Sequence, residues 1–131
     1  MKNIEVVAAI IFSENKILCV QRNLNKYDYI SLKFEFPGGK IEEGESKEQA
    51  LKREILEELN MDIIITKSFL TVYHKYPDFH LTMHSYICLC KETTMILREH
   101  VDFKWLTIDK LQTLIWAAAD IPIVEKLQIN G

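Results

Sequence analysis

The sequence predicts a single domain of the α/β (α+β) class that extends over residues 1–131. Three observations lead to this prediction. The chain has 131 residues and is 48% apolar, which is enough to bury one hydrophobic core. β-rich runs recur along the whole length and alternate with two or three segments of helical pattern. No repeat, low-complexity segment or linker divides the chain, and a charged fraction of 27% does not indicate disorder.

The β-rich runs end at turn-forming residues. Ser13-Glu14-Asn15-Lys16 predicts a hairpin turn between the first two runs, and Tyr76-Pro77-Asp78 predicts a turn between the two longest. Residues 22–33 are polar and mixed and predict a loop, while a short run after them stops at Pro37-Gly38-Gly39. The expected strands cover residues 4–12, 17–21, 34–36, 62–76, 80–90 and 101–106.

The clearest helical segment begins after Ser46. Ser46 is a good N-cap residue, and Gln49 three positions later completes a capping-box pattern. The apolar residues that follow recur every four positions, and Asn60 stands where a left-handed C-cap residue is expected. The stripe consists of Leu51, Ile55 and Leu59. Two further helices are expected at residues 108–114 and 121–128.

Charge and composition argue against several classes of function. A net charge of −3 is unlike that of a protein that coats DNA, so no nucleic acid polymer is expected as a partner. Glu5 interrupts the apolar N-terminal run, which therefore predicts a strand and not a signal peptide, and no run approaches the roughly 20 apolar residues that span a membrane. Cys19, Cys88 and Cys90 form no CxxC pair, and buried free thiols suit a cytoplasmic location.

Acidic residues gather on one face of the expected helix. Glu54, Glu57 and Glu58 fall within an arc of about 100°. The repulsion between them is explained either by exposure to solvent or by a bound divalent cation, which prefers oxygen ligands. The loop before the helix favours the cation, because Pro37-Gly38-Gly39 allows close backbone approach and Lys40 can reach a phosphate. The P-loop pattern is absent.

The segment GGKIEEGESKEQALKREILEELNM resembles the Nudix box of the Nudix hydrolase family. One position departs from the pattern, because Asn60 stands where the box ends in glycine, and asparagine tolerates the same backbone conformation. The positions that match are Gly39, Glu45, Arg53, Glu54, Ile55, Glu57, Glu58 and Met61. The resemblance implies the Nudix fold, in which a mixed β-sheet is sandwiched between helices.

By this resemblance the box would bind magnesium, with manganese as an alternative ion. The metal ligands would be Glu54, Glu57, Glu58, Glu99 and the Gly39 carbonyl. Arg53 would orient the carboxylates, Glu45 would support the loop or the metal site, and Lys40 would contact phosphate. The resemblance makes either Glu54 or Glu99 the general base, so the catalytic set is Arg53, Glu54, Glu57, Glu58 and Glu99. An exposed loop position is the alternative reading of Glu99, and His100 is expected on the surface.

The resemblance extends along nearly the entire chain to the MutT-like and CTP pyrophosphohydrolase branch. This branch cleaves single nucleoside triphosphates, often oxidised ones, to a monophosphate and pyrophosphate, and so cleanses the nucleotide pool. By likeness, Arg22 would reach the phosphates or the base, and Phe36, Tyr76 and Asp78 would line the base site. Asp120 would read the base edge as an ionised acceptor, which suits cytosine, or would simply cap the last helix. Phe79 replaces an arginine of the guanine-specific type, and Trp105 and Trp116 are expected in the core.

Cytidine or modified-pyrimidine triphosphates are therefore expected slightly ahead of 8-oxo-dGTP. Two alternatives stay open at this point: a hydrolase of ADP-ribose or of another nucleoside diphosphate derivative, and a non-catalytic nucleotide-binding module. We expect a monomer or a weak dimer.

Overall fold

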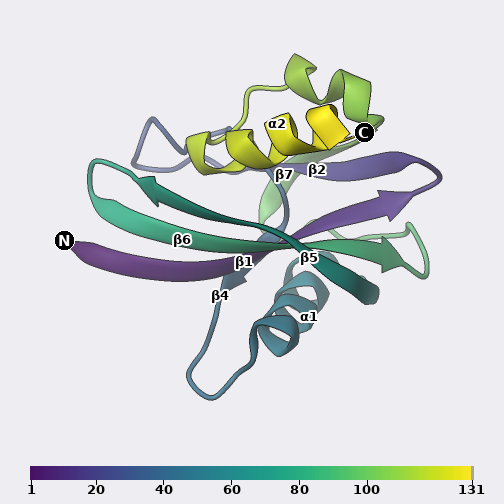
Figure 1. The fold of residues 1–131 in the computed structure, drawn as a ribbon, viewed down its shortest axis with the longest axis horizontal. Coiled ribbons are helices and arrows are strands. Elements are labelled where there is room, and N and C mark those ends of the chain that lie inside the picture. The colour runs from purple at the N-terminus through teal and green to yellow at the C-terminus, as the bar shows by residue number, and fades with distance from the viewer. Residues whose placement is uncertain (131) are drawn as a thin grey trace.

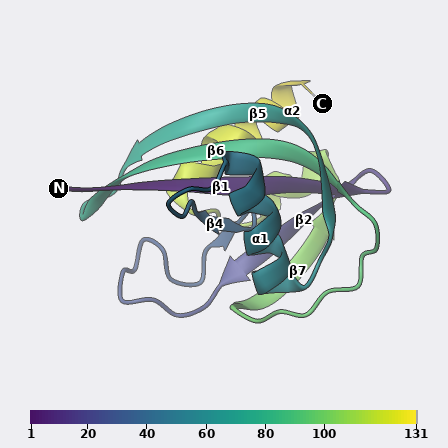
Figure 2. The same ribbon diagram turned by 90° about the horizontal axis from the view of Figure 1, so that it is seen from below.

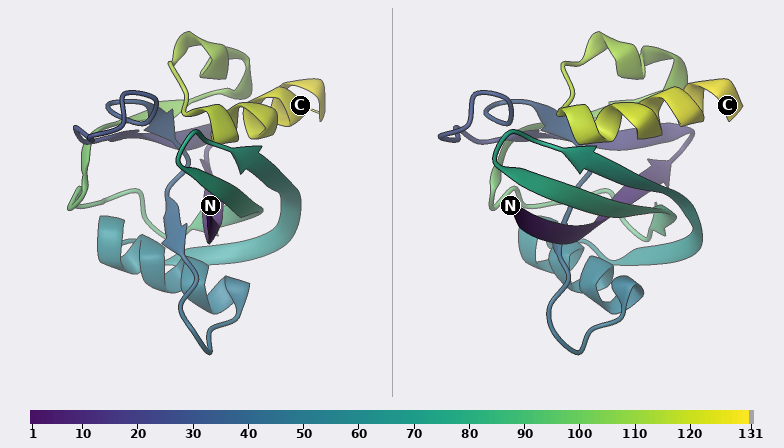
Figure 3. Two further views of the ribbon diagram at one scale, coloured as in Figure 1. Left: turned by 90° about the vertical axis from the view of Figure 1, so that its left-hand side faces the viewer. Right: turned by 60° about the vertical axis from the view of Figure 1, so that its left-hand side comes forward.

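The computed structural model describes residues 1–130 and contains a seven-strand sheet with helices on both faces (Figure 1). Helix α1 lies on one face, and the 3₁₀ helices η1 and η2 and helix α2 lie on the other (Figures 1 and 3). This arrangement confirms the expected mixed sheet between helices. The elements are β1 (Lys2–Ser13), β2 (Lys16–Arg22), β3 (Phe34–Glu35), β4 (Gly38–Lys40), α1 (Lys47–Leu59), β5 (Ile63–Lys75), β6 (Phe79–Cys90), β7 (His100–Leu106), η1 (Ile108–Thr113), η2 (Ala118–Asp120) and α2 (Ile121–Asn130).

Strand β1 organises the sheet. It runs parallel to β6 from the pair Lys2–Phe79 to the pair Phe12–Leu89, and it pairs antiparallel with β2 and β4. The main path is β3-β2-β1-β6-β5, and β7 adds to β2. The turn from β1 to β2 has Glu14 and Asn15 at φ 48° and 67°, as a two-residue hairpin with a matching twist requires. The predicted hairpin is confirmed.

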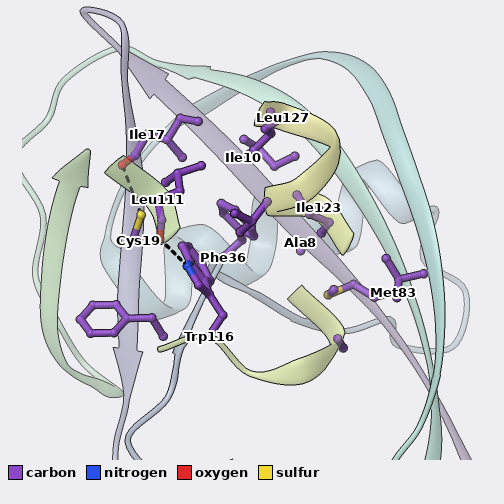
Figure 4. Close-up of a cluster of buried hydrophobic side chains, with 14 of the residues drawn as sticks. Ala8, Ile10, Ile17, Cys19, Phe36, Met83, Leu111, Trp116, Ile123 and Leu127 are labelled. Atoms are coloured by element: carbon purple, nitrogen blue, oxygen red, sulfur yellow. Dashed lines mark hydrogen bonds between the residues drawn. The ribbon is translucent and has the colours of Figure 1, made fainter. Parts of the chain in front are cut away.

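The core lies on both faces of the sheet because alternate residues of β1 point to opposite sides. Val7, Ala9 and Ile11 pack towards α1 with its apolar stripe. Ala8 and Ile10 pack towards α2 and η1, in one cluster with Ile123, Leu127 and Leu111 from these helices and Met83 from β6 (Figure 4). The cysteines are free, with Cys19 and Cys88 buried and Cys90 half-buried.

Both ends of α1 have the predicted caps. The Ser46 hydroxyl accepts a hydrogen bond from the Gln49 N–H at 3.1 Å, and the Gln49 side chain accepts one from the Ser46 N–H at 2.9 Å. Asn60 has φ 55° and ψ 38°, the left-handed conformation that ends the helix. The two caps therefore determine where α1 begins and ends.

Two elements differ from the expectation. The chain does not stop pairing at Pro37-Gly38-Gly39, because Gly38–Lys40 form the short strand β4 beside Val6–Ala8. Strand pairing uses backbone groups only, so glycines give no side-chain pattern from which it can be recognised. The segment Ile108–Thr113 is a 3₁₀ helix, in which the Leu114 N–H bonds to the Leu111 carbonyl. In the described part of the chain, no helix has the length and apolar character that a membrane span requires.

Candidate active site

A cavity of about 760 Å³ lies between the second half of α1, the strands β1, β4 and β6, the ends of β2 and β3, and η2. Its volume is in the range of sites that take a small organic ligand. Residues of the loop from 23 to 33 cover one side of it. Figure 2 shows this loop leaving the end of β2 and returning towards β4. One end of the cavity is acidic, with Glu54, Glu58 and Glu99, and the other is largely apolar and aromatic, with Phe36, Tyr76 and Phe79.

Arg53 lies next to the acidic end and contacts it through Glu54. Its guanidinium binds both oxygens of Glu45, at 2.6 and 2.8 Å. The same group donates to Glu54 Oε1 at 2.9 Å, to Glu57 Oε2 at 3.1 Å and to the Lys40 carbonyl at 3.0 Å. The side chain is 22% exposed, so these bonds are partly shielded from water. Arg53 thus holds the loop and the carboxylates of the helix in one arrangement.

Gly39 allows strand β4 to approach the carboxylate of Glu54. A Cβ atom at position 39 would lie 2.2 Å from Oε2 and 2.3 Å from the carboxyl carbon of Glu54. Since neither separation is possible for real atoms, any side chain here would displace Glu54. Only glycine, which has no side chain, lets the backbone at position 39 lie next to the Glu54 carboxylate in this arrangement.

Glu58 lies deepest in the acidic end, and only 8% of it is exposed. Burial, the adjacent Glu99 carboxylate and the charges of Glu54 and Glu35 raise the pKa of Glu58 well above its usual range. Its Oε2 atom is buried without a hydrogen-bond partner among the described residues. A buried, unpaired carboxylate oxygen beside other carboxylates is costly unless a cation or a proton compensates it.

Glu54 and Glu58 line this end of the cavity, and carboxylate oxygens such as the unpaired Glu58 Oε2 atom are ligands that a hard divalent cation prefers. Glu99 also lines the cavity and approaches Glu58. Among residues 1–130, no three acidic, histidine or cysteine side chains already enclose a position for an ion. Glu57 is 59% exposed and is held by Arg53, so it would have to turn inwards to join such a shell.

The apolar end places Asp120 against β3. Asp120 is 4% exposed, and its Oδ1 atom accepts a hydrogen bond from the Phe36 N–H at 3.0 Å. This bond joins η2 to the strand region and does not cap α2. Burial and the negative charge of Glu35 raise the pKa of Asp120 well above its usual range. A raised pKa favours the neutral acid, which can both donate and accept hydrogen bonds, over the ionised, acceptor-only form.

Aromatic side chains complete this end of the cavity. Tyr76 is buried, and its hydroxyl accepts a hydrogen bond from the Ala119 N–H at 3.0 Å. Phe79 lies against Tyr76, with ring centroids 5.1 Å apart. Phe36 also lines the cavity and stacks on Trp116 with a centroid distance of 4.7 Å (Figure 4). Trp116 is buried, as expected, and donates from Nε1 to the Leu111 carbonyl at 2.7 Å.

Three predicted residues lie nearer to the rim. Lys40 lines the mouth of the cavity and is exposed, so its ammonium group is free to meet a ligand. Arg22 lines the wall with 39% of its side chain exposed. The structure does not bring Asp78 into the lining: its carboxylate accepts a hydrogen bond from the Tyr29 hydroxyl at 2.5 Å, which ties the loop from 23 to 33 to the turn between β5 and β6.

Sequence reasoning missed two residues between the ends of the cavity. Glu35 accepts from Arg22 Nη1 at 3.1 Å through Oε1 and from His100 Nε2 at 3.0 Å through Oε2. The expectation that His100 is a surface residue is wrong, because its side chain is 4% exposed. A charged residue in a short strand directly before the glycine turn was the available signal for Glu35. His100 carried no such signal, because its burial depends on the pairing of β7 with β2.

Comparisons with known proteins agree with this geometry. The family model described as the NUDIX domain matches residues 2–127. The chain is 35% identical to a CTP pyrophosphohydrolase of Escherichia coli K12, over 95% of this chain and 91% of that protein. It is 30% identical to the 8-oxo-dGTP diphosphatase of the same organism, over 98% of each chain. A MutT protein of the Nudix hydrolase family from methicillin-resistant Staphylococcus aureus 252 aligns with a TM-score of 0.77 and 42% identity, over 100% of both chains.

Nudix hydrolases generally use divalent metal ions and act on nucleotide substrates, and the oxygen-rich end of this cavity is of that kind. The matched residues include the capped helix, the glycine strand and the Arg53 cluster described above. The chain belongs to the NUDIX family of hydrolases.

Proposed function

We propose that this protein is a Mg²⁺-dependent pyrophosphohydrolase that cleaves (deoxy)nucleoside triphosphates to a nucleoside monophosphate and pyrophosphate. One observation carries the proposal: a single cavity joins the carboxylate cluster of α1 to a pocket of aromatic residues with a buried hydrogen-bonding acid. The first end suits a phosphate chain with its metal, and the second suits a base. A ligand that needs both ends is a nucleotide.

Glu54, Glu57, Glu58, Glu99 and the Gly39 carbonyl would hold the metal. When bound, a divalent ion neutralises phosphate charge and lowers the pKa of a bound water. The unpaired Oε2 atom of Glu58 supports this assignment, because it is an oxygen ligand without another partner among the described residues.

The chain's own residues supply positioning and proton transfer. Arg53 holds Oε1 of Glu54, while Oε2 of the same carboxylate faces Gly39. We assign Glu54 as the acceptor of the attacking water's proton, with Glu99 as the alternative acceptor. Lys40 and Arg22, both on the cavity wall, place positive charge beside the phosphates.

For the base, we place cytidine and modified-pyrimidine triphosphates ahead of 8-oxo-dGTP. A neutral Asp120 offers one donor and one acceptor, which match the acceptor and donor on the pairing edge of cytosine. Phe79 packs on Tyr76 and adds an apolar surface to the site. The relative named CTP pyrophosphohydrolase is 35% identical and the 8-oxo-dGTP diphosphatase 30%, which favours the same order.

A substrate panel tests the proposal. CTP, dCTP, a 5-substituted dCTP, dGTP, 8-oxo-dGTP and ADP-ribose are compared by kcat/KM with Mg²⁺. We expect the highest value for a cytidine nucleotide, and a preference for 8-oxo-dGTP would overturn the order of bases. Preferred cleavage of ADP-ribose would favour the diphosphate-derivative hydrolase, and binding without turnover would favour the non-catalytic module.

Hydrolysis in ¹⁸O-labelled water identifies the phosphorus that is attacked. Attack on the β-phosphorus, the route of MutT-type relatives, puts the label into pyrophosphate. Attack on the α-phosphorus puts it into the monophosphate. We expect the label in pyrophosphate.

A further inference from the structure

We infer that His100 is a positioning residue, which fixes the carboxylate of Glu35 so that Glu35 can orient Arg22 in the wall of the cavity. The inference rests on the proposed function for its kinetic consequences. Its geometry stands independently of that function. The three side chains come from β7, β2 and β3, with β2 paired between the other two strands.

The strand pairing brings these side chains together. His100 is the first residue of β7 and is the register partner of Arg22 at the end of β2, where the pairing shifts by a bulge. β3 lies on the other edge of β2, and Val20 is the partner of Glu35. The bulge re-aims the end of β2, as bulges commonly do beside functional sites. The contact between His100 and Glu35 therefore joins strands that are not neighbours in the sheet.

Glu35 makes two contacts through different oxygens. Oε1 accepts from Arg22 at 3.1 Å and Oε2 accepts from His100 at 3.0 Å. Two contacts on opposite oxygens fix the rotation of the carboxylate, whereas one contact leaves it free to turn. The Glu35 side chain is 19% exposed, so water competes only weakly for these oxygens.

The hydrogen bond determines the state of the His100 ring. A carboxylate oxygen accepts, so Nε2 carries the hydrogen. The Nδ1 atom is then left buried, without a hydrogen-bond partner among the described residues. A buried ring nitrogen without a partner costs free energy. If this side chain served packing alone, an apolar aromatic residue would be more favourable at this position than histidine. The Nε2 contact therefore explains why a histidine stands here.

Glu35 is also placed to influence both ends of the cavity. Its negative charge raises the pKa of Glu58 at the acidic end and of Asp120 at the base end. A rotation of its carboxylate would release Arg22, whose guanidinium would then lose a fixed direction. The expected result is weaker binding of the nucleotide. The metal site should change little, because a rotated Glu35 carboxylate keeps its charge.

The test compares His100→Phe, which keeps the ring and removes the donor, with His100→Gln, whose amide can donate from a position close to Nε2. We expect His100→Phe to lower kcat/KM about tenfold, mainly through KM, and His100→Gln to recover most of it. The Mg²⁺ concentration for half-maximal rate should change by less than about twofold in both variants. A purely structural role at the start of β7 would instead disturb the adjacent Glu99 and move this Mg²⁺ requirement.

A readout independent of turnover accompanies the kinetics. Imidazole ¹⁵N NMR of the wild-type protein should show His100 protonated at Nε2, and Glu35→Ala should shift that signal. The inference is overturned if His100→Gln is as impaired as His100→Phe, if His100→Phe has wild-type KM, or if Glu35→Ala leaves the ring signal unchanged. Should the wild-type protein hydrolyse no triphosphate, the proposed function fails, and the NMR comparison alone decides the contact.

Discussion

The guanidinium of Arg53 forms a two-point ion pair with the carboxylate of Glu45, with Nε–Oε2 at 2.6 Å and Nη2–Oε1 at 2.8 Å. Glu45 belongs to the loop before α1 and Arg53 lies inside the helix. The pair therefore joins two segments that the helix's own hydrogen bonds do not connect. Since Arg53 also binds Glu54 and Glu57, it fixes the relative positions of three carboxylates.

This pair makes part of the stability depend on pH. The hydrogen bonds from Arg53 lower the pKa of Glu45 from 4.5 to about 2. A carboxyl whose pKa is lowered by folding stabilises the folded state above its unfolded pKa, and this contribution is lost as the pH falls from 4.5 towards 2. We expect the difference in Tm between the wild-type and Glu45→Gln proteins to be constant above about pH 5 and to become smaller at lower pH. A difference that grows as the pH falls would contradict the assignment.

Replacing Arg53 by lysine should impair the enzyme although the charge is retained. Lysine cannot bind Glu45 at two points and reach Glu54 and Glu57 at the same time. We expect Arg53→Lys to lower kcat/KM by about tenfold to a hundredfold, with α1 still formed by circular dichroism. Lys52→Ala, at an exposed neighbouring position, is the matched control and should retain wild-type activity.

Alanine substitutions at Gly38 and Gly39 of β4 and at Gly44 of the following loop should have different effects. A Cβ at Gly39 would meet the flexible side chain of Glu54, so Gly39→Ala should fold and lose activity. A Cβ at Gly38 would lie 1.9 Å from the Val7 carbonyl oxygen, so Gly38→Ala should lose at least about 3 kcal/mol of the free energy of unfolding.

Gly44 serves as the control for this series. It has φ +85° and no atom within 4 Å of a Cβ, so Gly44→Ala should cost about 1–2 kcal/mol and leave the rate unchanged. Denaturant unfolding and initial rates separate the three cases. An active Gly39→Ala enzyme would contradict the close approach of Gly39 to Glu54.

Asp120 should tolerate asparagine better than leucine. Asparagine is neutral, keeps an acceptor for the Phe36 N–H and offers a donor to the base, as a protonated Asp120 does. We expect Asp120→Asn to retain kcat/KM for the best substrate within about tenfold, and Asp120→Leu to lose about a hundredfold or more. Equal loss in both variants would show that the ionised acid is the one that binds.

The sequence alone was sufficient for the features that are local in the chain. The caps at Ser46 and Asn60, the hairpin at Glu14-Asn15 and the acidic face of α1 all depend on residues within a few positions of one another. The contacts between distant segments could not be read in this way. The hydrogen bond between His100 and Glu35 joins residues 65 positions apart. Both this bond and the burial of His100 depend on the order of strands in the sheet.

The same limit applies to protonation. The raised pKa of Asp120 follows from its burial and from the charge of Glu35, and neither is visible in a residue pattern. Strand β4 was missed for a related reason, because the backbone pairing of Gly38 and Gly39 leaves no side-chain signature.

The most direct test of the central claim is product analysis by ³¹P NMR for wild-type protein and Glu57→Gln, with the exposed Glu125→Gln on α2 as control. With CTP and Mg²⁺, we expect wild-type and Glu125→Gln proteins to release CMP and pyrophosphate in equal amounts, and Glu57→Gln to be slower by about a hundredfold. Chelation of the metal should stop the reaction. Release of CDP and inorganic phosphate, turnover without a divalent metal, or an unchanged rate in Glu57→Gln would contradict the account.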